Sequence, residues 1–376
     1  MFLRTVFLLG SGISLDAEMP GVDVITSQVV SGEGVFLHTA NVFLIDRANP
    51  NYALLRPPVE PVLSLVHDLR DLSADYLGRE PNYEEISQLA RQVDDALSGE
   101  YESAAVMPLV RELAGRDYVE DGHLHELLGQ THKYIHDLVH QMLDKPPARL
   151  DHLDVIVDAC RQLERVDLAT LNHDLVLEAA LNKGGIAYAD GFEQTEQDVR
   201  LWTDEWGEEN MRVLKLHGSL DWWGYQIADA PWRGWVTARY RGQDSFHPSR
   251  DGVCDYPYDL RPIFLTGTFD KILGYETWVF PDQHFRFHEA LREASRVVAI
   301  GYGFADKAIN SRLIAWLARA RGNKLVVCHG RPDELRERAR RAIQFKWEAW
   351  QADGQLVVVP RWIAQLHYDD VTSHLL

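Results

Sequence analysis

The stretch Arg-Thr-Val-Phe-Leu-Leu-Gly-Ser-Gly-Ile-Ser at residues 4–14 decides the fold. After Thr5 its run of apolar side chains continues to Leu9 and stops at Gly10. An unbroken apolar run of this length, bounded by glycine, is typical of a strand that is buried on both faces of a parallel sheet. The residues that follow, Gly10–Ser14, therefore predict a turn that leads from a strand into a helix.

The same order of apolar run and turn returns from residue 151 onwards. Strands are predicted at 166–171, 212–216, 296–300, 324–328 and 356–359, and helices at 153–163, 175–182, 281–293, 309–320 and 332–343. Strands that alternate with helices predict an α/β fold, here a Rossmann-like parallel sheet with helices on both faces. Because ligands of such folds bind beyond the carboxyl ends of the strands, the turns that follow the strands are expected to meet at one edge. These turns are residues 10–14, 172–174, 217–219 and 301–303.

Residues 59–150 show a different pattern, because apolar residues recur there at helical spacing and strand candidates are few. Helices are predicted at 61–76, 83–97, 104–113 and 123–143. We therefore expect a Rossmann-like domain built from residues 1–58 and 151–376, with residues 59–150 inserted as a helical subdomain. Residues 35–45 are expected to be extended. Residues 222–262 are rich in Trp, Tyr, Gly and Pro without a period, and are expected to form irregular loops.

Composition excludes several classes of protein. With 38 Lys and Arg against 57 Asp and Glu, the 376-residue chain has a formal charge of −19, which repels phosphate backbones, so no direct binding of nucleic acid is expected. The three cysteines, Cys160, Cys254 and Cys328, lie too far apart for a four-cysteine zinc module, and an odd, sparse count fits a reducing compartment. Since no early apolar run is long enough for a membrane span or a signal peptide, we expect a cytoplasmic protein without membrane association.

The glycine-bearing turns have two interpretations. Glycine lets a backbone approach a pyrophosphate, and the N-terminus of a helix favours its negative charge, so Gly10–Ser14 could cradle a dinucleotide. The full G-x-G-x-x-G pattern is absent because position 15 is Leu, and a tight strand-to-helix turn explains the same glycines. Gly301-Tyr302-Gly303 offers the same two interpretations at a second strand end.

Two other turns carry polar groups that can do chemistry. Asn172 and Asp174 could hold ribose hydroxyls or a water molecule, although Asp174 could instead cap the following helix. His217 is suited to general base catalysis near neutral pH, although it is one of 16 histidines. His173 is expected to face solvent. The histidines at 123, 125, 132, 136 and 140 lack a cysteine or clear carboxylate to complete a metal set, so no metal is expected.

Together these segments resemble the SIR2 (sirtuin-like) superfamily. Gly10–Ser14 looks like the Gly-Ala-Gly-Ile-Ser motif of that family, with Pro20 at the spacing of its proline. Thr170-x-Asn172-x-Asp174 looks like its T-x-N-x-D motif, and Lys215–Gly218 like the motif that carries its histidine. The segment 301–310 is similar to bacterial SIR2-like proteins.

The resemblance implies NAD+ as substrate and assigns roles to the matching residues. Asn172, His217 and Asp174 would be catalytic, with Asn172 positioning a water molecule and His217 acting as general base or orienting the ribose. The residues implied to bind NAD+ are Gly10, Ser11, Gly12, Ser14, Thr170, Asn172, Asp174, Gly301 and Tyr302. The family's fold is the one expected above, and the match spans about residues 10–310.

Departures from the family bear on the reaction. Deacetylating sirtuins carry a four-cysteine zinc module, which this chain cannot build, and Asp-Phe-Arg after the proline, where this chain has Gly21–Asp23. A chain that binds NAD+ but lacks the peptide site would transfer the ribosyl group to water, giving nicotinamide and ADP-ribose. The resemblance therefore implies an NAD+ hydrolase (NADase) that depletes NAD+ in anti-phage defence, without zinc.

Regulation of such an enzyme is expected to come from a homo-oligomer, or from a separate activator such as an ATPase or a nucleic-acid-guided protein. Two alternatives remain open at this point. One is an NAD+-dependent protein deacylase or ADP-ribosyltransferase, and the other is a non-enzymatic sensor of NAD+ or ADP-ribose.

Overall fold

A computed structural model describes residues 4–373, except residues 39, 46–58, 101–103, 121, 196, 208–209, 229, 231, 233, 241–252, 258 and 268–274. The contacts between residues divide the chain into two compact units. Unit 1 consists of Met1–Met19, Pro146–Leu265 and Ile272–Leu376, and unit 2 of Pro20–Lys145 and Thr266–Lys271. The helices predicted between residues 59 and 150 lie in unit 2, which begins at Pro20.

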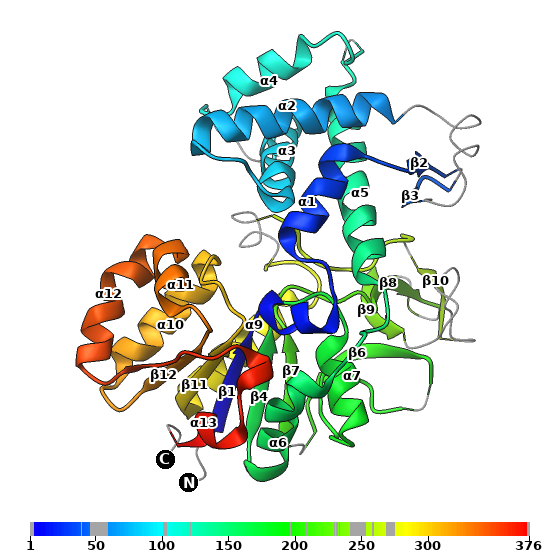
Figure 1. Ribbon diagram of the computed structural model, residues 1–376. Helices are drawn as coiled ribbons and strands as arrows, with labels where there is room; N and C mark the ends of the chain where they lie inside the picture. The colour runs from blue at the N-terminus through cyan, green and yellow to red at the C-terminus, as the bar shows by residue number, and fades with distance from the viewer. Residues whose placement is uncertain are drawn as a thin grey trace. The chain divides into compact units, whose positions relative to one another are not determined.

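Unit 1 is built on a six-stranded sheet in which every neighbouring pair is parallel (Figure 1). The strands, in spatial order, are β13 (Leu356–Val359), β12 (Lys324–Cys328), β11 (Ala294–Ile300), β1 (Arg4–Leu9), β4 (Val166–Thr170) and β7 (Met211–Lys215). Along the chain β4 and β7 extend the sheet to one side of β1, and β11, β12 and β13 extend it to the other. This order confirms the predicted Rossmann-like fold and places its switch point between β1 and β11, where such folds bind ligands.

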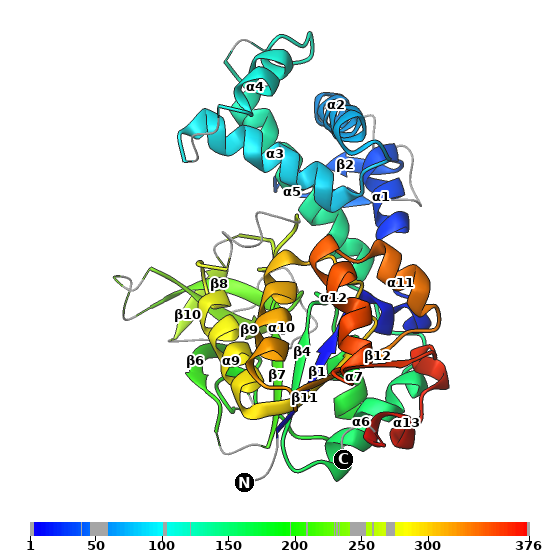
Figure 2. The same ribbon diagram turned by 90° about the vertical axis from the view of Figure 1, so that its left-hand side faces the viewer.

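Helices cover both faces of this sheet, as predicted (Figure 2). On one face Val6 and Leu8 pack with α9 (Phe280–Glu293), α10 (Lys307–Arg319) and α12 (Arg341–Ala352). On the other face Phe7 and Leu9 pack with α6 (Asp154–Gln162), α7 (Val176–Lys183) and α13 (Tyr368–Thr372). Burial from both sides explains why β1 is apolar at successive positions instead of at alternate ones.

The expectation of loops over residues 222–262 was wrong, because much of this segment belongs to a second, antiparallel sheet of unit 1. Its strands, in spatial order, are β10 (Cys254–Pro257), β8 (Trp222–Ile227), β9 (Trp235–Tyr240), β6 (Val199–Glu205) and β5 (Gly191–Phe192). Residues 241–252 of the predicted loop lie outside the described residues. The sequence pattern does not reveal this sheet, because the sheet buries charged side chains. Arg200 and Arg239 are buried, and both are ion-paired to Asp190.

Two predicted helices differ from the structure. No α-helix follows Gly10–Ser14 directly; 3₁₀ turns form at Ser11–Ile13 and Leu15–Ala17, and α1 (Val22–Ser31) begins only after Pro20 and Gly21. The helix predicted at 332–343 is two helices, α11 (Pro332–Arg338) and α12. The chain breaks between them at Ala339 and Arg340, where the Arg340 amide donates to the carbonyl of Phe304 instead of continuing a helix.

Unit 2 is mainly helical. Besides α1 it contains a short antiparallel pair, β2 (Val35–Leu37) and β3 (Phe43–Ile45), and the helices α2 (Glu60–Leu77), α3 (Tyr83–Ser98), α4 (Met107–Ala114) and α5 (Leu124–Leu143). Buried Leu65, Ile86 and Leu128 lie on its helices at the apolar positions that predicted them. Asn82 begins α3 with a reciprocal capping box to Glu85, which fixes where this helix starts.

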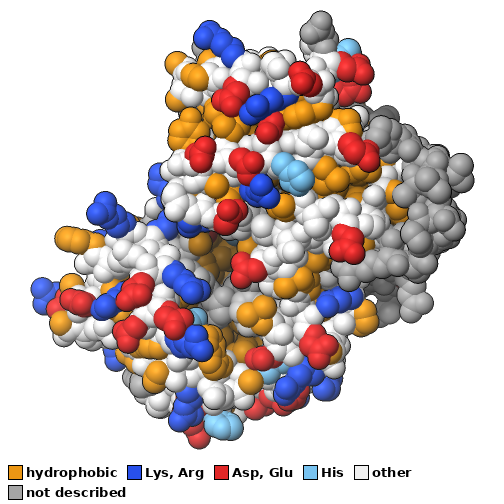
Figure 3. All heavy atoms as spheres, turned by 45° about the horizontal axis from the view of Figure 1, so that its top comes forward, with side chains coloured by type: hydrophobic (Ala, Val, Ile, Leu, Met, Phe, Trp, Pro, Cys, Tyr) orange, Lys and Arg blue, Asp and Glu red, His pale blue; other side chains and the backbone are white. Residues whose placement is uncertain are grey.

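On the face shown in Figure 3, acidic side chains do not form one continuous patch, because Asp and Glu are interspersed with Lys and Arg. Among the described residues, no helix combines the length and the apolar character needed to cross a bilayer.

Candidate functional site

The turn after β1 and the turn after β11 touch through their backbones at the switch point. The Gly10 amide donates to the Ile300 carbonyl and the Gly12 amide to the Gly301 carbonyl, both at 3.1 Å. A Cβ on Gly10 would lie 2.5 Å from the Gly301 oxygen, and one on Gly12 would lie 2.7 Å from the Gly301 Cα. These glycines are therefore required where the two turns cross, independently of any ligand.

Asn172 ties the turn after β4 to the turn after β1. Its Nδ2 donates to the Gly10 carbonyl at 3.2 Å and to the Ser14 hydroxyl at 3.0 Å, and its backbone amide donates to the Thr170 hydroxyl at 3.1 Å. Because the Gly10 carbonyl only accepts, the amide nitrogen must face it, which fixes the orientation of the side chain. The Oδ1 atom of Asn172 is then a buried acceptor with no hydrogen-bond partner among the described residues.

Asp174 and its neighbours hold the start of α7. The Asp174 carboxylate accepts from the Val176 amide at 3.1 Å, so it forms the turn that precedes this helix. Its backbone carbonyl accepts from Lys215 Nζ at 2.7 Å, and the same ammonium pairs with Glu178 at 2.9 Å. Both members of this ion pair are buried. Asp174 therefore forms a turn just before α7, but it does not cap this helix, because Leu175 is the N-cap and no side chain caps it.

His217 lies in a buried polar cluster beyond the end of β7, and its side chain is 5% exposed. Its Nε2 is 3.1 Å from the Tyr275 hydroxyl and 3.2 Å from Asp306 Oδ2, and the Tyr275 hydroxyl donates to that same carboxylate oxygen at 2.9 Å. Asp306 Oδ1 accepts from the Ile309 amide and thereby caps α10. Asp306 thus links the turn after β7 to the segment that follows β11.

A second layer of side chains supports this cluster. The Tyr275 ring lies on His284 of α9, with 3.7 Å between ring centroids, and His284 Nε2 is 3.1 Å from the Leu216 carbonyl. Since that carbonyl only accepts, Nε2 carries the proton, and Nδ1 accepts from Arg312 of α10. Burial, together with the Arg312 charge, lowers the pKa of His284 to about 2. Burial raises the pKa of Tyr275 above its ordinary range, and Asp306 adds to the shift.

A pocket of about 580 Å³ opens beside the switch point, a size within the usual range for small-molecule sites. Its wall contains Gly12, Gly301 and Tyr302 from the predicted site, together with His329 and Trp362. Asn172, Asp174 and His217 do not line it. Trp362 packs against His329 with ring centroids 4.6 Å apart and is 44% exposed, so an aromatic face stands at the edge of this pocket.

The structure brings all four predicted turns together. Besides the contacts of Asn172, the Leu216 amide donates to the Thr170 carbonyl, and the Leu220 amide to the His173 carbonyl, both at 3.0 Å. The expectation that His173 faces solvent was wrong: it is buried, and its ring lies 4.7 Å from that of Phe264.

Sequence reasoning missed Tyr275 and His284, which no motif marks, and included Asp306 only as part of the segment 301–310. An acidic residue two positions after Phe304 was the available signal for Asp306. Among the described residues, no group of three or more His, Cys, Asp or Glu is arranged to hold a metal ion.

Comparison with known proteins adds one family match. Residues 167–353 match the sequence model of a family described as the SIR2-like domain. No curated protein matches the chain significantly. Among solved structures, the chain is similar to a mutant Sir2 homologue in complex with 2'-O-acetyl ADP ribose, at 11% identity and a TM-score of 0.40, over 99% of this chain and 92% of that one. It is also similar to a Sir2 homologue in complex with NAD, at 10% identity and a TM-score of 0.40, over 99% and 89% of the two chains. The ligands in these complexes belong to those proteins.

Proposed function

We propose that this chain, whose residues 167–353 match the model of the SIR2-like domain, is an enzyme that hydrolyses NAD+ to nicotinamide and ADP-ribose. The observation that carries the proposal is Asn172. This side chain is held in one orientation by Gly10 and Ser14, and it leaves Oδ1 as a buried acceptor without a partner among the described residues. A buried unpaired acceptor costs free energy, and a water molecule or a ribose hydroxyl would satisfy it.

The reaction breaks the bond between the nicotinamide nitrogen and C1' of the ribose, and the electron pair leaves with nicotinamide. A water oxygen then bonds to C1', and one proton is released. Asn172 Oδ1 would accept a hydrogen bond from that water or from a ribose hydroxyl. When His217 Nε2 donates to Asp306, the basic lone pair of the neutral ring lies on Nδ1, the atom that would accept the proton.

Binding of the dinucleotide is proposed at the crevice of the switch point. The turn at Gly10–Ser14 and the turn at Gly301–Gly303 form one side of it, and the pocket of about 580 Å³ would take the adenosine half. The glycines contribute indirectly, because they let the two turns cross closely and keep side chains out of the crevice. This role differs from that of a cradle whose glycines contact the diphosphate themselves.

The test is release of nicotinamide from NAD+ by the purified full chain. Asn172→Ala should lower turnover at least about a hundredfold, as expected for loss of a group that acts on the reacting atoms. Asn323→Ala is the matched control, because Asn323 is equally buried, at 7% exposure, and its side chain donates to the Trp316 carbonyl away from the site. Equal activity of Asn172→Ala and wild type would overturn the assignment.

The assay should be run over a range of protein concentrations, because we also propose that activity depends on assembly into a homo-oligomer or on a separate activator such as an ATPase or a nucleic-acid-guided protein. A rate per chain that rises steeply with concentration supports self-assembly. This proposal, and that of NAD+ depletion during anti-phage defence, come from the motif resemblance alone. In cells, loss of NAD+ after phage infection that is absent with Asn172→Ala would support the defence role.

A second candidate is a non-enzymatic sensor of NAD+ or ADP-ribose. The engagement of His217 Nε2 by both Tyr275 and Asp306 favours it, since a base held in a closed cluster has less freedom to take a proton from water. A sensor would bind NAD+ tightly in equilibrium dialysis and release no nicotinamide at any protein concentration. A deacylase or ADP-ribosyltransferase would instead require an acylated peptide or a protein acceptor for turnover.

A further inference from the structure

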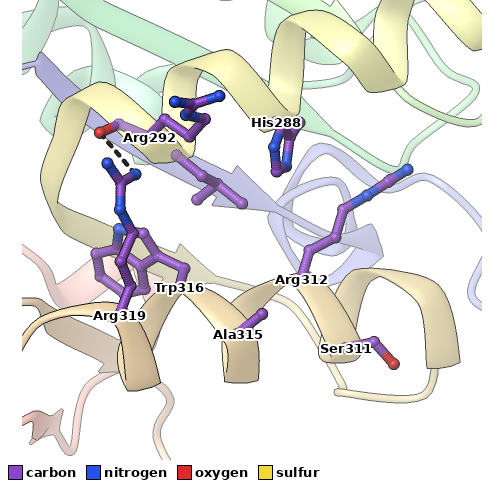
Figure 4. A pocket seen from close by; sticks show the side chains of 8 residues that line it. His288, Arg292, Ser311, Arg312, Ala315, Trp316 and Arg319 are labelled. Carbon is purple, nitrogen blue, oxygen red and sulfur yellow. Dashed lines mark hydrogen bonds between the residues drawn. The ribbon is translucent and has the colours of Figure 1, made fainter.

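A second cavity lies away from the switch point, in unit 1, between α9 and α10. It measures about 530 Å³, and Figure 4 shows its lining side chains. Its floor is apolar, because Leu291 and Trp316 are almost fully buried there. The indole nitrogen of Trp316 donates to the Ala294 carbonyl, so the polar atom of this ring is already satisfied within the fold. Ala315 keeps the groove open on the side of α10.

Three guanidinium groups surround this apolar floor: Arg292 from α9 and Arg312 and Arg319 from α10 (Figure 4). Among the described residues none of the three forms an ion pair, and Arg319 donates to the backbone carbonyl of Arg292 at 3.1 Å. The three acidic residues of α9 have other partners: Glu289 pairs with Arg286, Glu293 pairs with Arg4, and Asp282 accepts from the indole nitrogen of Trp202.

This concentration of positive charge is opposite in sign to the chain as a whole, whose formal charge is −19. Arginines around an apolar groove, with no carboxylate in an ion pair with them in the described part of the chain, create a local positive field that favours an anion. Asp306 and Glu276 lie near enough to Arg312 to offset part of its charge, whereas Arg292 and Arg319 are exposed at the groove. The apolar floor selects further, because an inorganic anion would leave Leu291 and Trp316 without a partner. An anion with an apolar body satisfies both parts of the groove.

The groove also reaches the His217 cluster through Arg312. This guanidinium is half-buried and donates to His284 Nδ1. His284 in turn bonds the carbonyl of Leu216, next to His217, and supports the ring of Tyr275. An anion that pairs with Arg312 would change the electrostatic potential at His284, because His284 contacts Arg312 directly.

We propose that the groove between α9 and α10 binds a small organic anion with an apolar body, such as an acyl or aromatic carboxylate, and that Arg312 transmits its presence to His284. The site is separate from the proposed NAD+ crevice, and the inference does not rest on the proposed reaction. A coupling of this kind needs a physical contact between the ligand and a side chain that also contacts His284. Arg312 is such a side chain, because it lines the groove and donates to His284.

The experiment is calorimetric titration of the full chain with decanoate, with decylamine and inorganic phosphate as comparison probes. We expect decanoate to bind at one site per chain, decylamine to be excluded by charge, and phosphate to bind weakly because it lacks an apolar body. Arg292→Ala should weaken decanoate binding about tenfold, the loss expected for one charge-assisted contact. Arg321→Ala is its control, since Arg321 is exposed near the end of α10 and does not line the groove.

Filling the groove tests the site by shape. Ala315→Trp should abolish decanoate binding, whereas Ala318→Trp, also at an exposed position of α10 but outside the lining, should leave it unchanged. The proposal is overturned if decanoate does not bind, if decylamine or phosphate binds equally well, or if Ala315→Trp binds decanoate like wild type.

The coupling has its own readout, independent of any enzymatic activity. In the protein labelled with ¹³C at histidine rings, decanoate should shift the signal that disappears in His284→Gln. The signal of His152 should not move, because His152 bonds the Ile13 carbonyl on the other face of the sheet. An unmoved His284 signal at saturating decanoate would refute the link through Arg312.

Discussion

Gly301→Ala is the substitution that most directly tests how the site is built. Gly301 has φ of +66°, a backbone conformation that L side chains rarely adopt, and a Cβ there would lie 2.6 Å from the Ile13 amide nitrogen and 2.9 Å from the Gly12 Cα. The left-handed conformation costs a non-glycine residue about 1–2 kcal/mol. Overpacking against backbone that cannot rotate away adds about 1–3 kcal/mol.

The free energy of unfolding should therefore fall by about 2–5 kcal/mol in Gly301→Ala. Urea titration followed by tryptophan fluorescence measures this loss, and the slope of the transition should not change. Gly303→Ala is the matched control in the same turn, since a Cβ at Gly303 meets nothing within 4 Å and its φ is not positive. Its unfolding free energy should change by less than about 1 kcal/mol, as for an ordinary surface substitution.

Equal stability of the two variants would refute the backbone crossing of Gly12 and Gly301. The comparison also separates fold from ligand. Gly303 lines the pocket of about 580 Å³ at the switch point, so Gly303→Ala places a methyl group near that pocket without straining the turn. A Gly303→Ala protein that is stable but binds NAD+ more weakly would support the proposed location of the dinucleotide.

Three further predictions concern buried polar groups. Lys215→Met should lower the unfolding free energy by about 3–5 kcal/mol, because it leaves the buried Glu178 carboxylate unpaired. In urea titrations, the double variant Lys215→Met/Glu178→Leu should recover most of this loss. A double variant that is as unstable as Lys215→Met would show that the ion pair is not the cause. In the folded chain, burial and the charge of Arg312 keep the pKa of His284 at about 2. Below about pH 6.5 this histidine therefore gains a proton only when the chain unfolds. The unfolding free energy should fall as the pH drops below that value, by up to about 1.4 kcal/mol per pH unit. His284→Gln should flatten that dependence between pH 6.5 and 4.5, and parallel pH curves of the two proteins would contradict the assignment. Asp306→Asn should keep the cap of α10, because Asn caps a helix as well as Asp does. If Asp306 orients His217, the variant should release nicotinamide more slowly, and the pH profile of the release should shift. An unchanged pH profile would mean that Asp306 has only the structural role of capping the helix.

The parallel sheet could be predicted because its strands are short apolar runs that end in glycine or polar turns. Burial on both faces favours apolar side chains in β1 and its neighbours, and that leaves a signal in the sequence that needs no knowledge of tertiary contacts. Asp167 of β4 is an exception, since it is fully buried and paired with Arg4 and Arg212. The convergence of the four turns followed from topology alone, because the carboxyl ends of parallel strands share one edge.

The antiparallel sheet could not be predicted in the same way. Its strands β6 and β9 bury Arg200 and Arg239, whose charges are compensated by Asp190 and, for Arg239, also by Asp221. A sequence pattern treats each of these residues as solvent-facing, since only the fold shows that a partner is present. The prediction that His173 faces solvent was wrong for a related reason, because its ring packs against Phe264, which lies far along the chain.

The His217 cluster shows the same limit at the site itself. Tyr275, His284 and Asp306 come from three segments that share no common motif, and of the three only Asp306 lies in a segment that the sequence analysis singled out, residues 301–310. Which side chain meets the predicted histidine is decided by the packing of α9 and α10 over the sheet. Spacing along the chain carries no information about that.

The strand order has a consequence for when the site can form during translation. Among the six strands of the parallel sheet, β1 leaves the ribosome first, but its neighbour β11, which precedes Gly301 and Asp306, begins only at Ala294. A nascent chain that has emerged through β7 already contains Asn172 and His217, yet one edge of β1 has no partner and half of the crevice is missing. A growing chain, or a proteolytic fragment that ends before residue 294, therefore cannot assemble the site, which can form only after β11 and Asp306 have been synthesised.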